Sequence, residues 1–232
     1  MKEFLKKYTK NLNIDLDDKK LQKFEDFYNF LQETNAHTNL IAKASPQDIW
    51  LKHFVDSLYF SKIKPKSPFN LLDIGSGGGF PSLPIQILYE ESKVMAVDSI
   101  GKKINFLNTS AKNLNLSNFN AVQIRAEDLS KEYLSSFDYV TARAVSSLDT
   151  LSEYCIPYLK QGGLFVAYKS KTAKEEIEQA KNAIKILGGE IVDIVEYNLE
   201  EFERNLIIIE KTTKTPPQYP RKAGLPKKSP LR

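Results

Sequence analysis

The sequence predicts an α/β fold, in which a helical segment precedes a seven-stranded, mostly parallel sheet with helices on both faces. Three observations predict it. Short apolar runs alternate with amphipathic segments from residue 69 onward, a glycine-rich turn follows the first apolar run, and the last two apolar runs have no helix between them. Such alternation is typical of a parallel sheet covered by helices, and two adjacent final strands predict a hairpin at its edge.

Residues 1–64 are expected to form an N-terminal helical extension. The segment 17–34 keeps one face apolar at spacings of three and four residues, at positions Leu21, Phe24, Tyr28 and Leu31. Ser45 is a candidate helix cap, because Pro46 follows it in the first turn of an apolar helical pattern. The polar connector 62–68, with two prolines, ends this segment.

The sheet is expected to occupy residues 65–211. Its expected strands are 69–74, 94–98, 120–124, 138–142, 164–168, 190–198 and 204–210. The expected helices are 82–90, 101–114, 128–135, 147–159 and 172–187. Ligands of such folds bind at the carboxyl ends of the parallel strands, so the residues that follow the strands are the candidates for a site.

Composition bounds the class of protein. The chain has 232 residues, 41% apolar and 27% charged, which is typical of a globular domain that needs no disulfides. Cys155 is the only cysteine, which excludes an intrachain disulfide and fits a reducing compartment. No uncharged apolar run approaches the length of a membrane span, and the N-terminus is too charged for a signal peptide. We therefore expect a cytoplasmic protein that spans no membrane.

The last 22 residues, 211–232, form a basic, proline-rich segment without an acidic residue. Its cations are Lys211, Lys214, Arg221, Lys222, Lys227, Lys228 and Arg232. Two interpretations fit this composition: a solvated end of the chain, or an extended arm that binds a polyanion such as RNA. We treat 212–232 as a separate C-terminal tail.

The glycine-rich turn lies in "NLLDIGSGGGFPSLPIQI", residues 70–87. A P-loop needs a lysine after its last glycine, and this turn has none. A dinucleotide fingerprint needs a third glycine where this chain has Phe80, although Gly75 and Gly77 fit the first two places. Asp73 at the strand end would repel a phosphate. A cationic ligand fits better, and S-adenosylmethionine carries a sulfonium and an ammonium but no phosphate.

Acidic residues also follow the second and third strands. Asp98 ends the second strand, where an acid can accept hydrogen bonds from ribose hydroxyls of either nucleotide class. "RAEDL" places Ala126 and Glu127 after the third strand, and Glu127 could equally begin the next helix. Asp98 therefore supports adenosine binding without choosing the cofactor.

The fourth strand is followed by "TARAVS", without the Asn/Asp-Pro-Pro-Tyr motif of amino-group methylases. Cys155 lies in an apolar helical pattern and is expected to be a buried core residue. No covalent nucleophile is therefore expected, and catalysis would rest on alignment, with Arg143 and Lys169 as candidates for contacts to substrate or cofactor.

His53, Asp56 and Ser57 lie on one face of a helix, but a hydrolytic triad would also need a strained nucleophile turn and an oxyanion hole, which this segment lacks. His53 is therefore expected to pack in the helical segment or to face RNA. His37 has no metal partner, and no metal site is expected.

Several segments resemble the bacterial small-subunit ribosomal RNA guanine-N7 methyltransferases, the RsmG or GidB family. They are "TNLIAKASPQDIWLKHFVDSL", "DIGSGGGFPSLP", "VDSIGKKINFL", "RAEDL", "FDYVTARAVSSL" and "PPQYPRKAGLPKKSP". The resemblance covers about residues 20–232. The combination of "VDSIGKK", "TARA" and "PRKAG" is the most specific part.

The resemblance implies a Rossmann-like class I S-adenosylmethionine-dependent methyltransferase fold. It implies cofactor contacts at Gly75, Phe80, Ala126, Glu127 and Arg143, with S-adenosylhomocysteine as product. The implied reaction is methylation of one guanine N7 in 16S rRNA, within naked RNA, the small subunit or an assembly intermediate. The target is expected in a loop, because side chains cannot reach N7 in the deep major groove of A-form RNA. A monomer is expected, since no large apolar stripe is left over after the core is assigned. Methylation of another RNA or small substrate, or an RNA-binding module with a vestigial cofactor site, stays open as an alternative.

Overall fold

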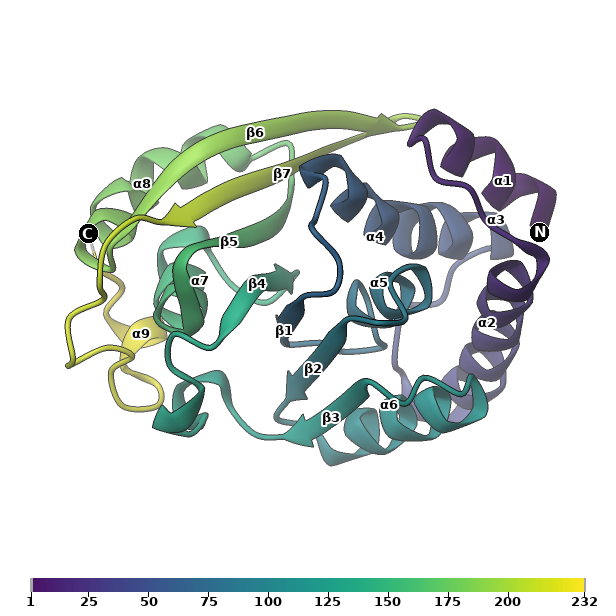
Figure 1. Cartoon of the computed structure of the whole chain (residues 1–232), viewed down its shortest axis with the longest axis horizontal. Coiled ribbons are helices and arrows are strands. Elements are labelled where there is room, and N and C mark those ends of the chain that lie inside the picture. The colour runs from purple at the N-terminus through teal and green to yellow at the C-terminus, as the bar shows by residue number, and fades with distance from the viewer. Residues whose placement is uncertain (1, 232) are drawn as a thin grey trace. The chain divides into compact units, whose positions relative to one another are not determined.

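The structure, a computed structural model, describes residues 2–231. These residues belong to two compact units. Unit 1 comprises the chain up to Phe69 together with Ser76–Gln123, and unit 2 comprises Asn70–Gly75 together with the chain from Ile124 onward. Figure 1 labels helices and strands of both units.

Within residues 2–231, seven strands form one mixed sheet in the order β3-β2-β1-β4-β5-β7-β6. They are β1 (Asn70–Ile74), β2 (Lys93–Asp98), β3 (Phe119–Gln123), β4 (Phe137–Arg143), β5 (Leu159–Ser170), β6 (Gly189–Leu199) and β7 (Phe202–Lys211). The pairs β1–β4, β2–β3 and β4–β5 are parallel, whereas β7 pairs antiparallel with both β5 and β6. The predicted sheet with a terminal hairpin is therefore confirmed.

Unit 1 holds the helical N-terminal segment and two strands. Its helices are α1 (Lys2–Asn11), α2 (Asp18–Thr38), α3 (Pro46–Ile49), the π-helical η1 (Trp50–Val55), α4 (Asp56–Leu58), the 3-10 helix η2 (Tyr59–Ile63), α5 (Ser82–Leu88) and α6 (Gly101–Asn113). Ser45 caps α3 as predicted, because its hydroxyl accepts a hydrogen bond from the backbone N–H of Asp48 at 3.1 Å.

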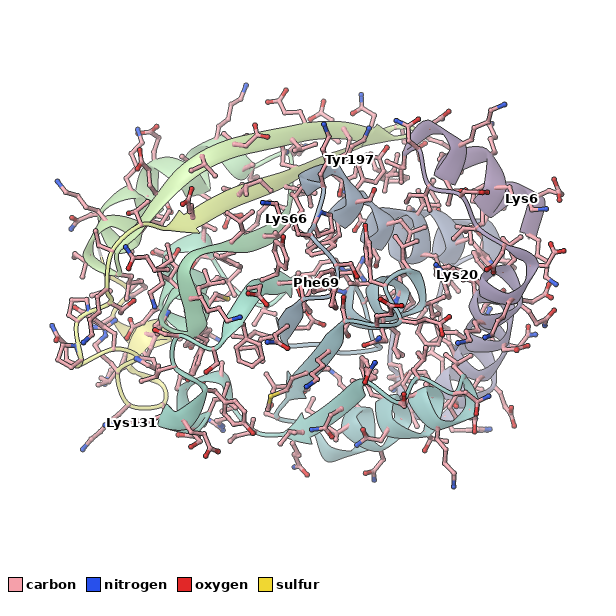
Figure 2. The ribbon with its side chains drawn as sticks, in the orientation of Figure 1. Lys6, Lys20, Lys66, Phe69, Lys131 and Tyr197 are labelled. Atoms are coloured by element: carbon pink, nitrogen blue, oxygen red, sulfur yellow. The ribbon has the colours of Figure 1, made fainter. Side chains whose placement is uncertain are left out.

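Aromatic side chains hold α2, η1 and the glycine turn of unit 1 together. The ring centroid of Phe54 lies 5.2 Å from that of Phe27 and 5.1 Å from that of Phe80. Farther along, the Lys20 ammonium donates to the carbonyl of Leu88 at 3.0 Å and so ties α2 to the end of α5. Figure 2 labels Lys20, together with Phe69, whose buried ring packs 5.3 Å from that of Tyr89.

Unit 2 contains five strands and the C-terminal helices (Figure 1). Its helices are the 3-10 turns η3 (Ala126–Asp128), η4 (Lys131–Tyr133) and η5 (Ile156–Tyr158), and the α-helices α7 (Leu148–Cys155), α8 (Ala173–Ile186) and α9 (Leu225–Lys228). Helix α7 packs against α8, β4 and β5. All eight residues of α7 are buried, including Asp149 and Glu153, so its polar side chains must find partners inside the protein.

Two expectations about unit 2 need correction. The helix predicted over 128–135 is wrong, because only the short turns η3 and η4 form there. Leu129 and Ser130 have extended backbone between them, and the Ser130 side chain accepts from the N–H of Glu132, which offers the backbone an alternative to helix. The fifth strand is also longer than the predicted 164–168, since β5 runs over Leu159–Ser170.

Candidate functional site

The glycine turn of unit 1 is anchored to the end of β2. The backbone N–H of Ser76 donates to the carbonyl of Val97 at 3.0 Å, and the N–H of Gly79 donates back to the carbonyl of Ser76 at 2.8 Å. The N–H of Gly77 donates to Oδ2 of Asp98 at 3.0 Å. The structure thus brings together two residues, Gly77 and Asp98, that lie far apart in the sequence.

Asp98 is the polar centre of this part of unit 1, with a side chain only 8% exposed. Its Oδ1 accepts from the N–H of Ile100 at 3.0 Å, and its Oδ2 lies 3.4 Å from the Lys103 ammonium. These contacts fix the direction of the carboxylate at the start of α6. Such a fixed acceptor at the end of the second strand is suited to the hydroxyls of a ribose.

The glycines are needed for conformation and for space. Gly79 in unit 1 has φ +90°, and a Cβ there would lie 2.7 Å from Leu83 Cδ1. Gly75 in unit 2 has φ +72°, and a Cβ there would lie 2.4 Å from Val145 Cγ2. Since L side chains rarely adopt positive φ, a tight, bare backbone is required at both positions.

Phe80 is almost fully buried, at 4% exposure, and its ring centroid lies 5.0 Å from that of the His53 imidazole. Its side chain therefore belongs to the aromatic core of unit 1 and packs there against Phe27, His53 and Phe54. His53 is followed one turn later by Ser57, whose hydroxyl donates to the His53 carbonyl at 2.6 Å. This back-bonded hydroxyl is not directed as a nucleophile.

Asp73 in unit 2 is completely buried in β1. Its Oδ1 accepts from the hydroxyl of Thr141 at 2.8 Å, and Thr141 is the residue paired with it on β4. A carboxylate in the strand layer makes this end of β1 acidic and repels an anionic ligand. The residues present fit a cationic group better than a phosphate.

Ala126 and Glu127 form the turn η3, which α7 and η5 hold from within unit 2. The hydroxyl of Tyr158 donates to the carbonyl of Ala126 at 2.9 Å, and the hydroxyl of Tyr154 donates to Oε1 of Glu127 at 3.2 Å. Burial raises the pKa of both phenols well above the ordinary value, with Glu127 adding to the shift at Tyr154, so both stay protonated donors.

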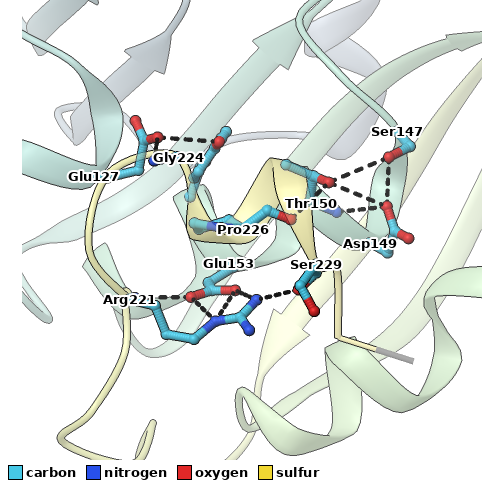
Figure 3. Close-up of polar contacts among 10 residues, drawn as sticks. Glu127, Ser147, Asp149, Thr150, Glu153, Arg221, Gly224, Pro226 and Ser229 are labelled. Carbon is cyan, nitrogen blue, oxygen red and sulfur yellow. Dashed lines mark hydrogen bonds and ion pairs between the residues drawn. The ribbon is translucent and has the colours of Figure 1, made fainter.

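A third donor reaches the same carboxylate from the C-terminal segment. The backbone N–H of Gly224 donates to Oε1 of Glu127 at 3.1 Å (Figure 3). Neither a solvated end nor an extended arm describes this part of the tail, which packs against α7 and forms α9. Tyr154, Tyr158 and Gly224 were missed by sequence reasoning. A buried tyrosine on an apolar helix gives no signal of its partner, and the "PRKAG" motif showed only that Gly224 is part of a recognisable segment.

The loop after β4 is held by a buried ion pair. The Lys169 ammonium, in a side chain 8% exposed, lies 2.6 Å from Oε2 of Glu176 and donates to the carbonyl of Ser146 at 2.8 Å. The same Oε2 accepts from the N–H of Leu148 at the start of α7. Lys169 therefore fixes this loop, while Arg143 lies half-buried at the carboxyl end of β4.

Cys155 is fully buried in α7, as predicted, and burial raises the pKa of its thiol. A protonated, enclosed thiol is not a nucleophile. Within residues 2–231, no group of three or more His, Cys, Asp or Glu side chains could hold a metal ion. The helices in that part of the chain include none that is long and apolar enough to cross a membrane.

Comparison with known proteins identifies the relatives of this chain. A family model described as rRNA small subunit methyltransferase G (GidB) matches residues 20–207. A ribosomal RNA small subunit methyltransferase G from Staphylococcus saprophyticus is 44% identical, with 94% of this chain and 93% of the relative covered. The protein of the same name from Clostridium kluyveri is 41% identical, with 99% and 98% covered.

Solved structures share the fold at low sequence identity. TYW2 from P. horikoshii, in complex with MeSAdo, superposes with a TM-score of 0.59 at 16% identity, covering 74% of this chain and 65% of that one. TYW2 from M. jannaschii, in complex with AdoMet, has a TM-score of 0.56 at 15% identity, with 67% and 76% covered. The fold is that of the class I S-adenosylmethionine-dependent methyltransferases.

Proposed function

Since the chain belongs to the rRNA small subunit methyltransferase G (GidB) family, we propose that it transfers a methyl group from S-adenosylmethionine to N7 of one guanine in 16S rRNA. It is an enzyme of the methyltransferase class. The observation that carries the proposal is the family match over almost the whole chain, together with a glycine turn bonded to Asp98 and lacking a phosphate-binding lysine.

The proposed cofactor contacts are the residues that the sequence singled out. They are Asp73, Gly75, Gly77, Phe80, Asp98, Ala126, Glu127 and Arg143. When bound, S-adenosylmethionine supplies an electrophilic methyl group on a sulfonium. Carboxylates of Asp73, Asp98 and Glu127 suit its cationic groups and its sugar hydroxyls, and the bare backbone at Gly75 and Gly77 permits a close approach. The buried ring of Phe80 supports this turn, and only its main chain is left for a ligand.

The reaction requires little chemistry from the protein. Guanine N7 carries an in-plane lone pair that is unprotonated at neutral pH, so neither a general base nor a covalent nucleophile is needed. The chain's residues bind and orient the two reactants, and effective molarity supplies the rate. Arg143, at the end of β4, is the candidate for a direct contact to substrate or cofactor. Lys169 acts through the loop that it fixes, because its ammonium is already bonded to Glu176 and Ser146.

The substrate sets the remaining properties. N7 lies in the deep major groove of an A-form helix, which side chains cannot read, so the target guanine is expected in a loop or unstacked. Ribosomal RNA as substrate implies a cytoplasmic protein, and we expect a monomer. The proposed division of labour is a helical extension over 1–64, a cofactor-binding domain over 65–211 and a basic tail over 212–232.

The test is a comparison of 16S rRNA from cells with and without this gene, mapped for N7-methylguanine. One modified position should disappear with the gene and return with the wild-type copy. A copy carrying Asp98→Ala should restore little, whereas Asp15→Ala, a surface carboxylate in the linker after α1, is the matched control and should restore it fully. An unchanged map would overturn the substrate. Titration of purified protein with S-adenosylmethionine tests the cofactor separately, and no binding would leave only an RNA-binding module.

A further inference from the structure

The C-terminal segment 219–229 is bound to the same carboxylate that is proposed to contact the cofactor. We propose that this segment positions Glu127 for S-adenosylmethionine, with Arg221 as its anchor and Gly224 as the group that reaches the carboxylate. The inference rests on the proposed function, because it takes Glu127 as a cofactor contact. It assigns the tail a role in the cofactor site in addition to any contact with RNA.

The anchor is an ion pair with a buried glutamate. The Glu153 side chain is 1% exposed on α7, and the Arg221 guanidinium bonds it through two nitrogens, with Nε 2.9 Å from Oε1 and an Nη 2.7 Å from Oε2. The backbone N–H of Arg221 also donates to Oε1 of Glu153 at 2.8 Å. Figure 3 shows this fork between the tail and the helix.

Burial of the Glu153 carboxylate explains why it is paired with Arg221. A carboxylate buried to this degree is strongly unfavourable unless it is paired and hydrogen-bonded, and a planar guanidinium satisfies both oxygens at once. The hydrogen bonds to Glu153 raise the pKa of Arg221 above its ordinary value. Among the residues that the structure describes, Arg221 is the only cation paired with Glu153, so α7 depends on the tail for its compensating charge.

Two further contacts close the segment around its anchor. The Arg221 guanidinium donates to the carbonyl of Ser229 at 2.9 Å, which joins both ends of the segment. Pro226 is buried, and its carbonyl accepts from the hydroxyl of Thr150 on α7 at 3.4 Å. Between these contacts the backbone of Gly224 adopts φ +83°, and in this conformation its N–H points at Oε1 of Glu127.

These contacts leave the Glu127 carboxylate with two hydrogen-bond donors on the same oxygen. Tyr154 and Gly224 both donate to Oε1 of Glu127, at 3.2 and 3.1 Å. Within residues 2–231, no protein group donates to Oε2, which is therefore the oxygen that remains for a ligand. Lys222 lies beside Arg221 in sequence, and its carbonyl accepts from the N–H of Leu225, but its exposed side chain takes no part in this arrangement.

The first experiment compares two variants that each lose one positive charge from the tail. Arg221→Gln should bind S-adenosylmethionine roughly 10-fold more weakly than wild type by calorimetry, which is the lower end of the effect of a hydrogen bond to a charged group. Lys222→Gln is the matched control and should bind it as wild type does. Both titrations are made well below the melting temperature of each variant, which circular dichroism supplies. Wild-type affinity in folded Arg221→Gln would overturn the proposal.

The second experiment separates positioning from general stability. In a Glu127→Ala background, Arg221→Gln should cause no further loss of affinity, because the tail acts through that carboxylate. An additive loss would show that the tail acts elsewhere. The exchange rate of the Gly224 amide proton, followed by NMR without cofactor, should rise in Arg221→Gln and in Glu127→Ala but not in Lys222→Gln. If the wild type binds no S-adenosylmethionine while Gly224 is protected, the proposed function fails and the tail contact stands.

Discussion

Lys211 offers a test of the electrostatics of unit 2. It is the first cation of the basic segment 211–232 in the sequence, yet its side chain is buried in the structure. Lys211 is 2% exposed at the end of β7, and its ammonium donates to the carbonyls of Leu159 and Pro157 at 2.8 and 3.1 Å. In the part of the chain that the structure describes, no carboxylate pairs with it. Desolvation lowers the pKa of Lys211 from 10.5 to about 8.

The sign and size of the effect follow from linkage. The unfolded chain keeps its proton up to about pH 10.5, whereas the folded chain releases it from about pH 8, so stability rises with pH between these values. At pH 7 the charged lysine costs about 3 kcal/mol, at 1.36 kcal/mol per pKa unit. By pH 9.5 roughly 1 to 2 kcal/mol of that cost has gone.

The assay compares wild type with Lys211→Met by urea unfolding at pH 7 and pH 9.5. The absolute difference between them also contains the hydrogen bonds that the variant lacks, but its change with pH isolates the titration of Lys211. Relative to the variant, wild type should gain roughly 1 to 2 kcal/mol on going to pH 9.5. Lys214→Met, which removes an exposed lysine nearby, is the matched control for the loss of one charge. A difference that does not change with pH would refute the reasoning.

Three further predictions concern ligand binding. Gly75→Val should abolish S-adenosylmethionine binding, because a branched side chain is strained at φ +72°, meets Val145 and fills the space proposed for the methionine part of the cofactor. Intact binding by calorimetry would count against a close cofactor approach at this position. Asp98→Ala should weaken the same binding by roughly 1.5–3 kcal/mol, and wild-type affinity would mean that the ribose is held elsewhere. Replacing the exposed lysines 222, 227 and 228 by glutamine should reduce the salt dependence of RNA binding, by roughly 0.7–0.9 in the log–log slope for each RNA phosphate that the protein no longer neutralises. An unchanged slope would show that these lysines do not touch RNA.

Local patterns predicted the elements of the sheet well. Runs such as "LLDI" and "VMAVD" are apolar because a strand in the interior of a parallel sheet is buried on both faces, and this requirement is visible in a few consecutive residues. The cap at Ser45 and the terminal hairpin were predictable for the same reason, since their causes lie within a few residues. The structure of residues 128–135 was not predictable in this way, because the side chain of Ser130 bonds the backbone there in place of a helical hydrogen bond.

The sequence by itself also determined which ligand class the glycine turn excludes, since the missing lysine and the acid at Asp73 are chemical facts that need no coordinates. Only the tertiary structure decided which charges are available. In the sequence, nothing distinguishes Arg221, Lys169 and Lys211 from cations that are available to a ligand. Folding buries all or part of each and bonds them to Glu153, Glu176 and backbone carbonyls. Their partners lie 68, 7 and 52 residues away. Whether a charge is free or already compensated depends on desolvation and on what packs against it, and neither is encoded in neighbouring residues.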